Sequence, residues 1–112
     1  MKKIIKNICF YLILIFILIH FRLVFVQGCS MEPTLKQNDM LIVNTLNKSP
    51  EIGDIVIIKP LIYFSDNYVI KRVTKITDSQ VFVEGDNKDH SYDSRMVGWI
   101  DKKDLLGTII FK

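Results

Sequence analysis

The long apolar run near the N-terminus constrains this chain more than any other feature. From Ile8 to Val26, 17 of 19 residues are apolar or aromatic, the exceptions being His20 and Arg22. A helix that crosses a membrane needs about 20 such residues, and Arg22 can extend its charged end toward the lipid headgroups. We therefore expect residues 1–27 to form a short tail and a transmembrane anchor, and residues 28–112 to form a separate domain.

The distribution of charge predicts how the anchor is oriented. Residues 1–27 carry four basic residues and no acidic one, whereas the remainder has 11 basic and 12 acidic residues. Lys2, Lys3 and Lys6 precede the apolar run, and such lysines favour a cytoplasmic N-terminus. We expect a single-pass protein of the cytoplasmic membrane with its domain on the outer face and lipid as a partner. A basic face that would bind nucleic acid is not expected.

The segment after the anchor reads as a mainly β, antiparallel domain. Its apolar clusters are short and rich in β-branched residues, and the stretches between them are rich in turn-forming Asn, Asp, Ser, Gly and Pro. No helical period of useful length occurs outside the anchor. The expected strands are Met40–Val43, Asp54–Ile58, Tyr68–Val73, Gln80–Val83 and Gly107–Phe111.

The cysteines and histidines indicate neither a disulfide nor a metal site. Cys9 lies inside the expected helix and Cys29 beyond its end, too far apart to be bridged within one chain. His20 and His90 lie on opposite sides of the anchor boundary, and the sequence contains no CxxC or His-rich spacing. No metal or cofactor is expected. Nothing in the sequence places a histidine near Cys29, which disfavours a thiol protease.

One alternative hypothesis concerns Cys29 itself. The stretch "VQGC" approaches the lipoprotein signal, in which a cysteine after a small residue becomes the lipidated N-terminus, and a basic and an apolar region precede it. Against this hypothesis, Gln27 is polar, and His20 and Arg22 interrupt the apolar region just before the supposed cut.

The neighbouring Ser30 is a candidate nucleophile that requires a base. A serine hydroxyl is a weak nucleophile at neutral pH unless a neighbouring group takes its proton. His90 and the lysines are candidates, and Lys71 would serve if burial destabilised its ammonium form. In a strand, Lys71 and Arg72 face opposite sides, so one of them would point toward the apolar face. The alternative is that both are solvated charges on an edge strand.

The third notable stretch is "GDNKDHSYDSR", Gly85 to Arg95. It holds hydroxyls able to orient an amine, and Asp93 and Arg95 could brace a loop through charge-assisted hydrogen bonds. Taken alone, the two could equally form an ordinary surface ion pair.

Together, "SMEPTL", "GDIVIIKP" with "YVIKRV", and "GDNKDHSYDSR" resemble the boxes of the bacterial type I signal peptidases, or leader peptidases. These are membrane-anchored serine proteases with a Ser/Lys dyad. The separation of 41 positions between Ser30 and Lys71 is similar to that in the compact, Gram-positive-like form. The resemblance implies removal of signal peptides from exported preproteins after small-x-small sites, with no obligate protein partner. A membrane-anchored β binding module without activity is the alternative from another class.

The resemblance also implies a role for particular residues. Ser30 would be the nucleophile and its backbone N–H the oxyanion donor, Lys71 the general base, and Ser91 the residue that orients the lysine amine. Asp93 and Arg95 would be structural supports. Gly28 stands where some members carry a second, hydroxyl donor. The first substrate pocket would be lined by Val26, Met31, Leu35 and Ile70, although all four could simply be core residues.

The sequence departs from larger members of the family after "KRV". Those members continue with an "IGLPGD"-like stretch and often an inserted β subdomain, whereas this chain continues with "TKITDSQVFVEGDN". Only 13 residues separate Lys71 from Gly85.

Overall fold

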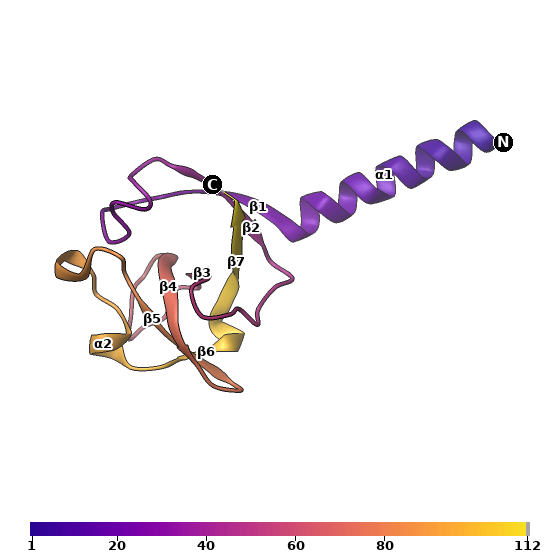
Figure 1. Ribbon diagram of the computed structural model, residues 1–112. Coiled ribbons are helices and arrows are strands. Elements are labelled where there is room, and N and C mark those ends of the chain that lie inside the picture. Colours follow the sequence, from indigo (N-terminus) through magenta and orange to yellow (C-terminus); the bar gives the residue numbers. More distant parts are fainter. Residues whose placement is uncertain (112) are drawn as a thin grey trace.

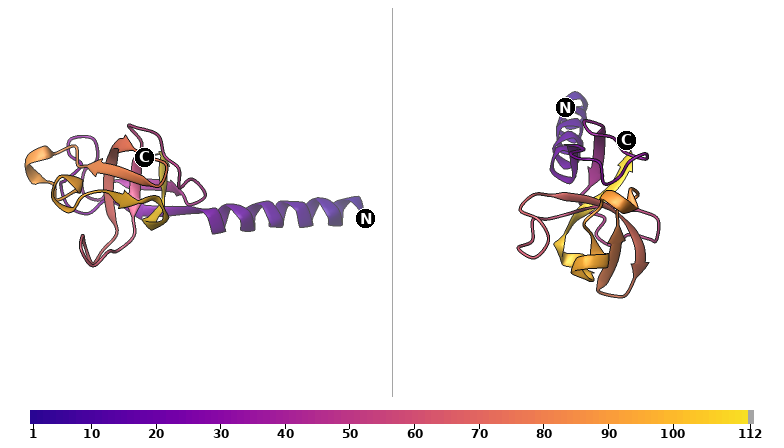
Figure 2. Two further views of the ribbon diagram at one scale, coloured as in Figure 1. Left: turned by 90° about the horizontal axis from the view of Figure 1, so that it is seen from below. Right: turned by 90° about the vertical axis from the view of Figure 1, so that its left-hand side faces the viewer.

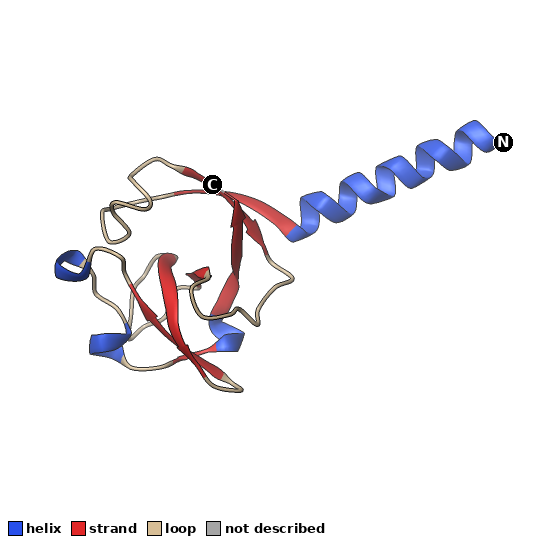
Figure 3. Ribbon diagram, viewed as in Figure 1, coloured by secondary structure: helices blue, strands red, loops and turns tan. Residues whose placement is uncertain are grey.

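The computed structural model describes residues 1–111, which form an N-terminal helix and a β domain. Helix α1, Lys2–His20, projects away from the domain and buries none of its residues (Figures 1 and 3). It is long and apolar enough to cross a membrane, by length and composition. The expectation of a mainly β domain on one N-terminal helix is confirmed.

The helix ends earlier than the apolar run predicts. Strand β1, Phe21–Phe25, follows His20 directly and pairs antiparallel with β2, Met40–Asn44. The predicted helical span to Val26 is therefore wrong for its last residues. The His20 carbonyl accepts hydrogen bonds from the backbone N–H of Thr45 at 2.9 Å and from its hydroxyl at 2.8 Å. These bonds hold the end of the helix on the domain. Figure 2 shows the N-terminal helix continuing directly into the domain.

The strands of the described residues form one antiparallel sheet in the order β1-β2-β7-β3-β4-β5-β6. Each of the five predicted strands is present, with ends that differ by at most three residues. Strands β1 and β6 are additional. The other strands are β3 (Ile55–Ile58), β4 (Val69–Ile76), β5 (Gln80–Glu84), β6 (Ile100–Asp101) and β7 (Leu105–Phe111).

Short helical turns occur where the sequence predicts loops. Helix α2, Ser94–Val97, and two 3-10 turns at Lys88–His90 and Lys102–Asp104 connect the last strands. None is long enough to show a helical period, because a period of 3.6 residues needs several turns to be recognised.

Two apolar clusters support the domain. The larger includes Val56, Val73 and Val83 from adjacent strands. The smaller consists of Val26, Met31, Leu35 and Leu41, with Ile55, Ile70 and Ile109 packed against it. Val26 lies just after β1, and Met31 follows Ser30, so burial of these side chains fixes the segment around Ser30 against the sheet.

Candidate active site

A pocket of about 770 Å³ opens between the end of β1, the segment after it, and β4. Residues 24–31 line one side, and residues 67–71 line another. Ser30 and Lys71 therefore face the same pocket although 41 positions separate them. The pocket also includes Val26, Met31 and Ile70 from the predicted substrate pocket. Leu35 and Ser91 are not among its lining residues; Leu35 is in the core, with 1% of its surface exposed.

Lys71 lies in β4 opposite Val56 of β3, and only 4% of its surface is exposed. Burial lowers the pKa of its ammonium group below the ordinary value of 10.5, because a charged group loses solvation inside the domain. The negative charge of Asp93 raises the pKa of Lys71, against the effect of burial, whereas the positive charge of Arg95 lowers it further. Because the pKa of Lys71 is lowered overall, a larger fraction of its side chain is the neutral amine at a given pH.

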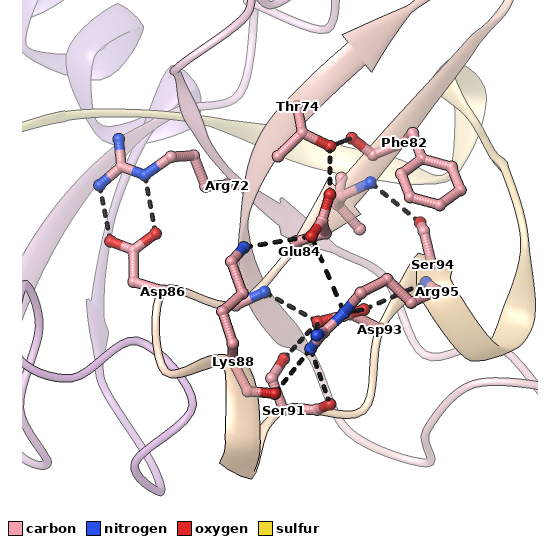
Figure 4. Close-up of polar contacts among 12 residues, drawn as sticks. Arg72, Thr74, Phe82, Glu84, Asp86, Lys88, Ser91, Asp93, Ser94 and Arg95 are labelled. Atoms are coloured by element: carbon pink, nitrogen blue, oxygen red, sulfur yellow. Dashed lines mark hydrogen bonds and ion pairs between the residues drawn. The ribbon is translucent and has the colours of Figure 1, made fainter.

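Arg72 lies on the other side of the same strand and is partly exposed. Its guanidinium donates two hydrogen bonds of 2.8 Å to Asp86 (Figure 4). It also donates one of 2.6 Å to the carbonyl of Gly53. The hydrogen bonds from Arg72 are the main cause that lowers the pKa of Asp86. The two adjacent basic residues thus have opposite placements, as strand alternation requires.

Asp93 is the centre of a buried hydrogen-bond cluster. Its carboxylate accepts from the Ser91 hydroxyl at 2.6 Å, the Gly85 backbone at 2.9 Å, and both the backbone and side chain of Arg95 at 3.0–3.1 Å (Figure 4). Although burial by itself would raise the pKa of Asp93, the hydrogen bonds from Arg95, Ser91 and Gly85 hold it well below its usual range. Asp93 also caps helix α2. Asp93 and Arg95 therefore form a partly buried, hydrogen-bonded pair and not an ordinary surface ion pair.

The turn that contains Ser30 is held by the segment after β5. The backbone N–H of Asn87 donates to the Ser30 carbonyl at 2.9 Å, and its side-chain Nδ2 donates to the Cys29 carbonyl at 3.0 Å. Gly85 packs so closely that an added Cβ would overlap the Ser91 hydroxyl and lie 2.6 Å from the Ser30 carbonyl oxygen. Gly85 and Asn87 were not predicted from the sequence to have a role. The only signal for them was their place in the "GDN" of the third stretch.

The pocket also brings Cys29 and His90 to its lining. Nothing in the sequence alone indicated that a histidine and Cys29 would line the same pocket. The Cys29 thiol is free and exposed.

The fold and pocket define a class of protein: a β-sheet domain on an apolar helix, with a serine hydroxyl and a buried lysine amine at one pocket. The chain matches the family model described as signal peptidase, peptidase S26, over residues 1–74 and 66–112. The chain belongs to this family, so the resemblance inferred from its three motifs is confirmed. The two matched segments overlap at residues 66–74, which include Lys71.

The chain is similar to curated proteins that are named as signal peptidases or as a membrane protease subunit. A probable signal peptidase I-2 of Synechocystis is 27% identical over 127 aligned positions, covering 74% of this chain and 58% of that protein. A probable signal peptidase I-1 of the same organism is 23% identical, covering 79% and 68%. The mitochondrial inner membrane protease subunit 1 of Xenopus tropicalis is 29% identical, covering 77% and 65%. The chain thus spans 58% to 68% of the length of these relatives.

Proposed function

We propose that this protein is a type I signal peptidase, a serine endopeptidase that removes signal peptides from exported preproteins after small-x-small sites. The observation that carries the proposal is the shared pocket of Ser30 and Lys71, in a chain of the signal peptidase family. The lowered pKa of the buried lysine supports its use as a base.

In this mechanism, the neutral amine of Lys71 takes the proton of Ser30 as its oxygen attacks the carbonyl carbon of the scissile bond. The backbone N–H of Ser30 stabilises the resulting oxyanion. The C–N bond then breaks, and the lysine returns the proton to the leaving amine. Water, deprotonated by the same amine, hydrolyses the acyl-enzyme and restores Ser30. No metal or cofactor enters these steps.

Ser91 would orient the lysine amine in this scheme. Its hydroxyl proton is donated to Asp93, so the oxygen offers only lone pairs to any further neighbour. A lysine amine has N–H donors, and an acceptor of this kind would hold one of them while the nitrogen lone pair faces Ser30. Asp93 and Arg95 support this arrangement by fixing Ser91 in place.

The substrate would bind as an extended strand along β1 and the start of β4. Strand β1 is at the edge of the sheet, and residues of both strands line the pocket. An edge strand offers unpaired backbone groups to an extended peptide. Val26, Met31 and Ile70 give the pocket an apolar wall that suits a small side chain before the cut, and Leu35 supports that wall from the core.

Helix α1 would anchor the enzyme in the cytoplasmic membrane, with the domain on the outer face. Its apolar composition is compatible with a membrane span, and the three lysines near the N-terminus favour the cytoplasmic side. Exported preproteins and membrane lipid are then the partners of the protein.

The test is cleavage of a labelled preprotein by the full chain in lipid vesicles, with Ser30→Ala as the control. The proposal expects a product that begins directly after a small-x-small site and no product with Ser30→Ala. Binding without cleavage by the wild type would instead indicate a binding module. A lipoprotein would be recognised by intact mass, as a chain that begins at Cys29 and carries a diacylglyceryl adduct.

A further inference from the structure

The peptide unit between Cys29 and Ser30 carries the proposed oxyanion donor on one side and a hydrogen-bonded carbonyl on the other. The donor is the N–H of Ser30. The carbonyl of Cys29 accepts a hydrogen bond of 3.0 Å from Nδ2 of Asn87 and one of 3.1 Å from the backbone N–H of Glu32. Because the peptide unit is planar, bonds that fix the carbonyl direction also fix the N–H direction.

We propose that Asn87 is a positioning residue that orients the Ser30 N–H and strengthens it as the oxyanion donor. The inference rests on the proposed function. A hydrogen bond to the oxygen of an amide polarises the whole group, so its N–H becomes a better donor in turn. Gly28 provides no side-chain donor, so the proposed oxyanion site depends on this backbone N–H. The orientation and polarisation of the Cys29–Ser30 peptide group then control much of the stabilisation of the transition state.

The surroundings of Asn87 hold its amide in place. The preceding Asp86 is fixed by two hydrogen bonds from Arg72, which is adjacent to Lys71 in β4. Gly85 is fixed by its hydrogen bond to Asp93. The backbone N–H of Asn87 is bonded to the Ser30 carbonyl. The segment therefore ties the turn of the nucleophile to the strand of the base, and the Asn87 side chain extends from a rigid support.

Two substitutions separate the side-chain hydrogen bond from the backbone one. Asn87→Ala keeps the backbone donor to Ser30 and removes only the bond to the Cys29 carbonyl. We expect kcat to fall about tenfold with KM within about twofold of wild type, because the oxyanion exists only after substrate has bound. Asn87→Asp has the same size but no donor, and it places a negative charge near the oxyanion. Its kcat should fall further than that of Asn87→Ala.

A matched control is Asn47→Ala. The side chain of Asn47 also bonds to a backbone group, accepting from the Ser49 N–H at 3.2 Å, but it does not line the pocket. This variant should keep wild-type kcat. The midpoint of the ascending limb of the pH–rate profile should also be unchanged in Asn87→Ala, since the inferred role does not act through Lys71.

A pair of inhibitors gives the most specific readout. A peptide aldehyde adds the Ser30 hydroxyl to its carbonyl and forms a hemiacetal, whose oxygen occupies the oxyanion position, whereas the matching peptide alcohol cannot react. Asn87→Ala should weaken aldehyde binding by about the factor lost in kcat/KM and leave alcohol binding unchanged. The ratio of the two affinities is independent of the fraction of protein that is folded.

Two results would overturn the inference: wild-type kcat in Asn87→Asp, or equal losses of aldehyde and alcohol affinity. Failure of the proposed function itself would look different. In that case the wild-type enzyme would not cleave the preprotein, or Ser30→Ala would cleave it as well as wild type.

Discussion

The Ser91 hydroxyl donates a 2.6 Å hydrogen bond to the carboxylate of Asp93. Both residues are buried, and the same carboxylate oxygen accepts from the Gly85 backbone at 2.9 Å. Since a hydroxyl has one proton, Ser91 has only acceptor capacity left for another group. This bond thus leaves the Ser91 oxygen as an acceptor, as the proposed contact with a lysine amine requires.

Because of the buried carboxylate of Asp93, the domain should lose stability at acidic pH. Its pKa is lower in the folded state than its ordinary value of 3.8, so its contribution is fully present above about pH 5 and is lost as pH falls through the ordinary value and below. The urea midpoint of wild type should fall over this range. Asp93→Asn should lose about 2 kcal/mol of unfolding free energy at pH 7 and show a flatter dependence. Parallel pH profiles for the two proteins would contradict this assignment.

Activity should rise toward alkaline pH with a limb that belongs to Lys71. Only the neutral amine can accept the Ser30 proton, so kcat/KM increases as pH rises through the pKa of the lysine in the free enzyme. Burial lowers that pKa from 10.5, and the limb should lie below this value. The measurement is kcat/KM from pH 6 to 10 with a soluble peptide substrate. A flat profile, with chemistry shown to limit the rate, would exclude a titrating lysine base.

Gly85→Ala should impair both folding and turnover. The added methyl group would overlap Ser91 and press against the Ser30 carbonyl, which are both parts of the proposed site. Overpacking of this kind costs about 1 to 3 kcal/mol, and relief of the overlap would displace the Ser30 turn. Thermal melting and kcat measure the two effects.

Gly98→Ala is the control for this experiment. Gly98 has a positive φ of 87° but open space around its Cβ position. Its substitution should cost stability through backbone strain of about 1 to 3 kcal/mol and leave turnover per folded molecule unchanged. Equal turnover in the two variants would show that the contact of Gly85 with Ser30 and Ser91 has no functional part.

Much of the sheet could be predicted from the sequence because each long strand forms its own β-branched cluster between turn-rich stretches. Strand β1 could not, because Phe21–Phe25 continues the apolar run, and hydrophobicity alone does not distinguish the end of a spanning helix from a strand. The pairing of β1 with β2 and the bonds from Thr45 to His20 decide between them. Strand β6 has two residues, too few to show an alternating pattern.

The candidate site was predicted in part. Motif order pointed to Ser30 and Lys71, and the structure brings them to one pocket. The contacts of Asn87 could not be predicted, because its partner Cys29 lies 58 positions away and any polar loop residue fits the same pattern. The presence of His90 at the pocket likewise depends on how the segment after β5 folds back toward the turn of Ser30.

The orientation of the chain can be tested independently of its chemistry. Protease added outside intact spheroplasts should digest the β domain and leave helix α1 protected, because Lys2, Lys3 and Lys6 favour the cytoplasmic side. Immunoblots with antibodies to each end would follow the two parts. Protection of the β domain until the membrane is permeabilised would show that the orientation is reversed.

The central claim is that Ser30 and Lys71 act together as nucleophile and base. Its controls are Cys29→Ala and His90→Ala, which remove a thiol and an imidazole from the pocket lining and should keep most activity. Lys71→Met should be at least as stable as wild type, because it removes an amine whose charged form is disfavoured by burial. A thermal melt of Lys71→Met checks this expectation and separates a loss of activity from unfolding.

The most direct measurement is the single-turnover rate of preprotein cleavage by the membrane-inserted variants. Ser30→Ala and Lys71→Met should each lower the rate by about a thousandfold or more, because the nucleophile and the base act in the same step and neither works without the other. Ser91→Ala should give an intermediate loss, because it disturbs only the orientation of the amine. Near-normal cleavage by Lys71→Met, together with loss of cleavage in His90→Ala or Cys29→Ala, would contradict the serine and lysine assignment.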